Sequence, residues 1–144
     1  MFTRTHARPL PKTKRRGAAA VELAISLPFL LTLAFGMFEY NSLIMLRARM
    51  VSAAYESARL ATRPNTSQQN VATAGGVTTY CNTLLSQLGV QGAMVTLTPS
   101  DLSTATPQTV VTVSITAPLS RNSLTTLVLG SSRTTTANAT LIIE

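Results

Sequence analysis

Hydrophobic and polar positions first separate an apolar run near the N-terminus from the rest of the chain. Residues 23–38 carry no charge and are mostly apolar. As a helix these 16 residues would span about 24 Å at ~1.5 Å per residue. That length falls short of the ~30 Å hydrocarbon core of a bilayer. Including Ala18 to Glu22 gives a helix long enough to cross the core but places the carboxylate of Glu22 within the membrane. Pro28 is compatible with such a helix, because proline kinks a membrane helix rather than ending it.

The helical pattern continues beyond the apolar run. Polar residues recur at spacings of three and four, which places them on one stripe: Arg49, Ser52, Glu56, Arg59 and Arg63. The opposite side is apolar: Ile44, Met50, Val51, Ala54, Tyr55, Ala58 and Ala61. Arg47 interrupts this side near the expected membrane surface, where its long side chain can snorkel. We predict one helix from Ala18 to Thr62, ended by the Arg63-Pro64 pair.

Residues 66–144 have a different pattern, rich in threonine and with four charges. A short helix is predicted near 68–88, with Gly89 at its end. Its expected apolar face comprises Val77, Tyr80, Cys81, Leu84, Leu85 and Leu88. Three segments rich in Thr, Val and Ile are predicted strands: 93–98, 108–117 and 133–143.

Within the second predicted strand, Val111, Val113 and Ile115 alternate with Thr and Ser, which indicates one covered and one wet face. The long connection that follows offers leucines available to pack: Leu124, Leu127 and Leu129. The predicted fold is α+β: a long transmembrane and amphipathic helix, a short helix and a three-stranded antiparallel sheet. We expect a basic leader (1–17), a stalk helix (18–63) and an extracytoplasmic head (64–144).

The net charge of +7 belongs to the leader. Six of the 12 basic residues lie among the first 16 positions. The rest of the chain contains six basic and five acidic residues, so its net charge is +1. A basic tail before an apolar run is typical of a topology signal. A nucleic-acid-binding tail is the alternative, but no basic folded face accompanies it, and we expect no nucleic-acid partner.

No enzyme is expected from this composition. One His, one Cys and five scattered acids form no triad, dyad or metal site, so we predict no catalytic residue, metal, cofactor or small-molecule substrate. Cys81, the single cysteine, is expected to be a buried thiol; an intermolecular disulfide is the alternative.

Glu22 is the residue that needs explaining, because a charge in a membrane helix is costly and usually functional. The order of Gly17, Ala18, Ala19, Ala20, Val21 and Glu22 resembles type IV pilin-like precursors. More narrowly, "RGAAAVEL", "FGMFEY" and "AAYESARLA", with the proline at Pro28, resemble the TadE-like family of tight-adherence (Tad/Flp) pilus-assembly proteins. Major Flp pilins have tyrosine after the motif glutamate. Leu23 stands there here, which favours a minor pilin-like role.

The resemblance implies cleavage between Gly17 and Ala18 by a prepilin peptidase. It also implies that Glu22 sets the register of assembly with other pilin-like subunits and Tad assembly proteins. The new amine of Ala18, with an ordinary pKa near 8, would be cationic and about one helical turn from Glu22. Pairing the two charges lowers the cost of either in lipid. Alternatively, Glu22 marks the membrane edge and faces water.

The basic leader predicts a single-pass protein of the bacterial inner membrane, with a cytoplasmic N-terminus and a periplasmic head. Glu39, Tyr40 and Arg47 are predicted to lie at the membrane interface, in contact with lipid. Three alternatives are weighed against a minor pilin-like subunit. They are a signal-anchored subunit of another envelope complex without processing, a secreted protein, and an enzyme completed by a partner's residues.

Overall fold

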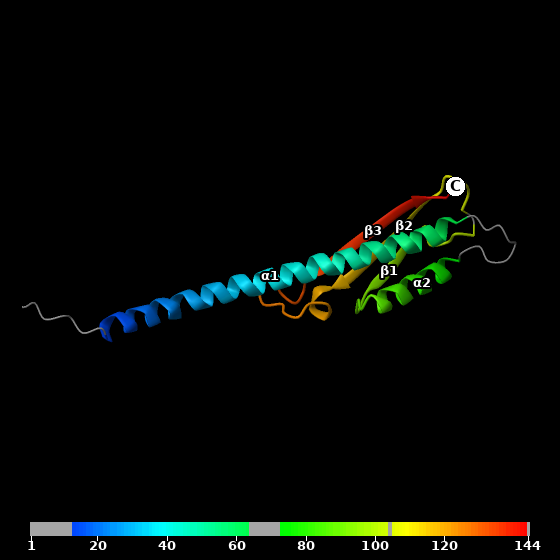
Figure 1. Ribbon diagram of the computed structural model, residues 1–144. Helices are drawn as coiled ribbons and strands as arrows, with labels where there is room; N and C mark the ends of the chain where they lie inside the picture. Colours follow the sequence, from blue (N-terminus) through cyan, green and yellow to red (C-terminus); the bar gives the residue numbers. More distant parts are fainter. Residues whose placement is uncertain (1–12, 64–72, 104, 144) are drawn as a thin grey trace, which may run out of the picture. The chain divides into compact units, whose positions relative to one another are not determined.

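The structure is a computed structural model that describes residues 13–63, 73–103 and 105–143, with side chains from residue 17 onward. The elements in order are α1 (Thr13–Thr62), α2 (Ala74–Gln87), β1 (Met94–Thr98), β2 (Val110–Pro118), the 3-10 turn η1 (Leu119–Arg121) and β3 (Thr134–Ile142) (Figure 1). Two compact units divide between Ala34 and Phe35. Most of the predicted leader, the Pro64 boundary and residues 68–72 of the predicted short helix lie outside the described residues.

Helix α1 ends at Thr62 as predicted but begins at Thr13, five residues before the predicted start at Ala18. Lys14, Arg15 and Arg16 therefore continue the helical backbone. Pro28 lies inside α1, as predicted. The Thr32 hydroxyl donates to the Pro28 carbonyl at 2.9 Å, a hydrogen bond within the helix.

The three predicted strands are confirmed to within two residues, and they form an antiparallel sheet in the order β1-β2-β3. Val110 pairs with Ile142 at one end of the β2-β3 ladder, and Pro118 pairs with Thr134 at the other. Threonines face each other on the side away from the core, with the hydroxyls of Thr112 and Thr140 3.1 Å apart. The predicted alternation of a covered and a wet face is therefore confirmed.

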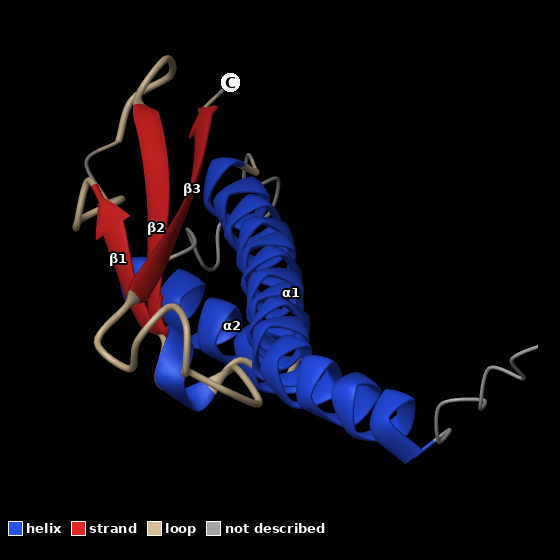
Figure 2. Cartoon of the chain, turned by 90° about the vertical axis from the view of Figure 1, so that its left-hand side faces the viewer, coloured by secondary structure: helices blue, strands red, loops and turns tan. Residues whose placement is uncertain are grey.

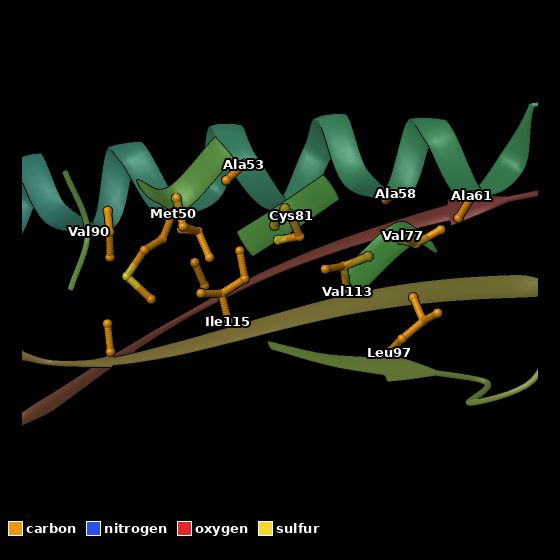
Figure 3. Close-up of a cluster of buried hydrophobic side chains, with 14 of the residues drawn as sticks. Met50, Ala53, Ala58, Ala61, Val77, Cys81, Val90, Leu97, Val113 and Ile115 are labelled. Carbon is orange, nitrogen blue, oxygen red and sulfur yellow. The ribbon is translucent and has the colours of Figure 1, made fainter. Parts of the chain in front are cut away.

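The core of the second unit lies between the sheet and the helices (Figure 2). Val111, Val113 and Ile115 of β2 are fully buried. On α1 the matching surface is made of small side chains around Met50, which allows the sheet to approach closely (Figure 3). Its fully or nearly fully buried members are Ala53, Ala54, Ser57, Ala58 and Ala61.

Helix α2 is held at both ends by local hydrogen bonds. The Thr73 hydroxyl accepts from the backbone N–H of Gly76 at 3.1 Å, a standard N-cap. Gly89 follows the helix with φ +71°, a conformation that glycine adopts without strain, so the predicted end is confirmed. Val77, Cys81 and Leu85 form the buried face.

Two of the residues expected on that apolar face do not belong to the core. Tyr80 is 41% exposed and Leu88 is 36% exposed, so the buried face of α2 is narrower than the predicted apolar face. Leu88 is the C-cap residue, at the point where the chain leaves the helix. The helical period indicated the correct side of α2 but did not define its width.

Candidate assembly and membrane surfaces

The first unit presents an uncovered apolar helix. Every side chain from Ala18 to Leu33 is exposed, including the large ones such as Leu23 and Phe29. Helix α1 is long and apolar enough to cross a membrane, and none of its most apolar stretch is buried in the structure. A soluble chain rarely leaves so large a contiguous apolar surface open, so this surface needs lipid or other helices around it.

Gly17, Ala18 and Glu22 lie within this surface. The structure places all three in α1, so Ala18 and Glu22 are one turn apart on the same side of the helix. No atom lies within 4 Å of the position that a Cβ of Gly17 would occupy. Glu22 is exposed and, among the residues that the structure describes, receives no hydrogen bond. Its carboxylate is therefore accessible to a partner.

A second exposed apolar surface lies on α1 within the second unit. The predicted apolar side of the amphipathic helix divides in two: Met50, Ala54, Ala58 and Ala61 are buried, whereas Ile44, Val51 and Tyr55 are 43–51% exposed. The predicted polar stripe from Arg49 to Arg63 is exposed throughout, as expected. Thus α1 has three faces here: one in the core, one polar and one apolar but uncovered.

The uncovered face contains a shallow hollow that is open to its surroundings. It is lined by Tyr40, Leu43, Ile44, Arg47, Ala48 and Val51. All these residues belong to α1, so the hollow follows the helix surface. With Tyr55 further along, the exposed residues recur at helical spacing, which is the pattern of a helix-packing surface. Tyr40 and Arg47, predicted at the membrane interface, are both exposed on this surface.

Glu39 is the most unusual charged residue of the second unit, because its side chain is completely buried. Its carboxylate accepts the backbone N–H of Val128 at 3.0 and 3.1 Å, one distance to each oxygen. Oε2 also accepts the N–H of Leu129 at 2.7 Å. Charge-assisted bonds of this length are strong, so Glu39 fastens the segment around residue 128 to α1. We call this arrangement the Glu39 clamp.

Sequence reasoning assigned Glu39 to the membrane interface and did not find the clamp. The partners are backbone groups 89 and 90 positions along the chain, which no side-chain motif can reveal. The available signal for an unusual segment was the long connection between Arg121 and Arg133, which contains three leucines and no charged residue. The leucines of that stretch were expected to be available to pack, and Leu124 and Leu127 are 94% and 77% exposed.

Cys81 is a buried free thiol, as predicted. Burial raises the pKa of this thiol, against a smaller lowering by its hydrogen bond with Ser57. A raised pKa and full burial describe an unreactive structural cysteine. The described residues contain no group of three or more His, Cys, Asp or Glu placed to hold a metal ion.

Comparison with known proteins agrees with the resemblance noted in the sequence. Neither the curated proteins nor the solved structures include a significant match. The family described as "TadE-like protein" matches residues 17–59. That segment begins at Gly17 and includes Glu22, Glu39 and most of α1. The family match thus covers about 30% of the chain, the same N-terminal segment in which the sequence resembles the TadE-like family.

Proposed function

We propose that this protein is a minor pilin-like subunit of a Tad-type pilus or secretion assembly, anchored in the bacterial inner membrane. The observation that carries the proposal is the uncovered apolar part of α1 with Gly17 and Glu22 at its start, inside the segment that matches the TadE-like family. The role is structural rather than catalytic. The head stands outside the cytoplasm, because positive charge concentrates before the apolar run.

Two surfaces support association with other subunits. Glu22 has no donor among the described residues of its own chain, and in lipid an isolated carboxylate is costly. The free amine of a processed neighbour would supply a cation at the same depth. The apolar strip from Tyr40 to Tyr55 offers a second helix a packing surface above the membrane.

Processing separates this proposal from its main rival, a signal-anchored subunit of another envelope complex. The full chain is expressed with its cognate prepilin peptidase, and the mass of the membrane-bound product is measured. We expect the mature protein to begin at Ala18. A product that retains Met1 in the presence of an active peptidase would contradict the pilin-like assignment and support the rival.

Gly17→Leu gives the matched variant for this experiment. The space around Gly17 is open, so a larger side chain there disturbs no packing within the chain. Loss of cleavage would thus reflect recognition by the peptidase rather than misfolding. Ala20→Leu, also at an exposed position, is the control and should be processed normally.

A further inference from the structure

The connection between η1 and β3 exposes large apolar side chains. In this leucine loop (residues 122–132), Leu124 is 94% exposed, Leu127 is 77% exposed and Val128 is 51% exposed. No charged residue occurs between Arg121 and Arg133. A loop on a soluble surface is normally polar, so this composition indicates a loop that meets an apolar environment.

The leucine loop is fixed in position by hydrogen bonds at both ends and in its middle. At the ends, Leu119 N–H donates to the Arg133 carbonyl at 2.8 Å, and the Asn122 side chain bonds to Gln91 and Pro118 at 2.8–2.9 Å. In the middle, the Glu39 clamp holds Val128 and Leu129. The leucines are therefore presented outward by a constrained backbone.

The loop lies where the apolar run of α1 ends. Glu39 is the first charged residue after Phe38, and a Val128 methyl lies 3.9 Å from the position of a Cβ on Gly36. Figure 1 shows the orange loop beside the cyan part of α1. Counted from Ala18, a hydrocarbon core of ~30 Å takes about 20 residues of helix and ends near Phe38, next to the Gly36-Val128 contact.

The clamp also makes this position possible for a loop. Backbone N–H groups without partners are very unfavourable at membrane depth. Glu39 satisfies the N–H groups of Val128 and Leu129, and these groups in turn satisfy its carboxylate. The carboxylate is fully covered, so the loop and Glu39 together present side chains that are apolar or uncharged.

We propose that the leucine loop is a second membrane contact, with Leu124 and Leu127 inserted into the outer leaflet of the bilayer that α1 crosses. The inference rests on the proposed membrane anchoring. The occupant is lipid because Val128 of the loop lies against Gly36, which belongs to the uncharged run of α1 that is proposed to cross the bilayer. The contact fixes the head against the membrane surface before assembly. Val110 and Ile142 pair at the end of the sheet opposite the Pro118-Thr134 pair, and it is from the Pro118-Thr134 end that the chain enters and leaves the leucine loop.

Depth-dependent quenching tests this contact in the full chain. Single cysteines replace Leu127, Leu30 or Ile142 in a Cys81→Ala background, and each carries an environment-sensitive fluorophore. All three positions are at least half exposed, so the changes spare the core. The proteins are reconstituted in vesicles of phosphatidylethanolamine and phosphatidylglycerol, with or without lipids that carry a nitroxide near the headgroup end or near the middle of the acyl chain.

We expect quenching at Leu30 and Leu127 and none at Ile142. Quenching at Leu30 alone would overturn the loop contact and leave membrane anchoring intact. A blue-shifted but unquenched fluorophore at Leu127 would assign the loop to a protein partner and would also overturn it. No quenching at any position would overturn the loop contact together with the anchoring. Quenching at all three would contradict the head orientation on which the proposal depends.

Discussion

Ile115→Ala tests whether the face of β2 that is covered by the helices is the stabilising core. Ile115 is fully buried and belongs to the same cluster as Cys81 and Met50 (Figure 3). Truncating a buried isoleucine to alanine costs about 2–5 kcal/mol, depending on how far the surroundings collapse. At 1.4 kcal/mol per factor of ten, the population of opened core should rise about 30- to 4000-fold.

Cys81 provides the measurement. It is the only cysteine and is fully buried, so a maleimide can reach it only when the core opens. When closing is faster than the chemical reaction, the labelling rate is proportional to the opened population. The full chain in detergent micelles is incubated with the reagent, and the labelled fraction is followed by mass.

Ile142→Ala is the matched control. Ile142 lies in β3 of the same sheet but is 56% exposed. The substitution removes strand propensity and some contact, which should lower the free energy of unfolding by less than about 1 kcal/mol. The labelling rate should then rise by less than about fivefold. If the Ile115 variant is labelled no faster than the Ile142 variant, the helix-covered face does not protect Cys81 and the described core is wrong.

Three further predictions follow from individual residues. Burial raises the pKa of the Cys81 thiol above its ordinary value of 9.0. The contribution of the neutral thiol to folding stability is therefore complete below pH 9 and is lost as the pH rises through the raised pKa. The urea midpoint should consequently fall more steeply above pH 9 in the parent than in Cys81→Ala. Glu39→Gln turns an amide N–H toward the backbone N–H groups of the clamp, so it should speed trypsin cleavage after the exposed Arg121 and Arg133. Glu56→Gln, at an exposed position, is the control and should not change the cleavage rate. Equal cleavage rates in both variants would contradict the clamp. Glu22→Gln should keep membrane level and processing but reduce co-purification with other pilin-like subunits, and unchanged recovery would refute the register role.

The sequence predicted the elements well because each has a strong local signal. The period-2 alternation of Val111, Val113 and Ile115 located β2, and the Arg63-Pro64 pair located the end of α1. The width of each buried face was harder to predict. Ile44 and Val51 have the same apolar character as Met50, yet the sheet covers only one side of α1. Which of several apolar residues becomes buried depends on the position of the partner element, which helical periodicity does not contain.

The two carboxylates in or beside the apolar run show the same limit at the level of function. Glu22 was conspicuous in sequence because its neighbours follow a processing pattern, whereas Glu39 looked like an ordinary boundary charge. In the structure their situations are reversed. Glu39 is fully satisfied by backbone donors within the chain, and Glu22 has no donor among the described residues.

This difference separates folding from assembly. A carboxylate whose donors all come from its own chain serves the fold, so its loss should be visible in an isolated subunit as a freed loop. Under the proposed function, Glu22 lies in a membrane helix and its donor is the free amine of a processed neighbouring subunit. Loss of Glu22 should consequently leave the monomer intact and appear only when subunits meet. A Glu22 variant that misfolds as a monomer would place its partner within the chain and remove the physical reason for a pilin-like register.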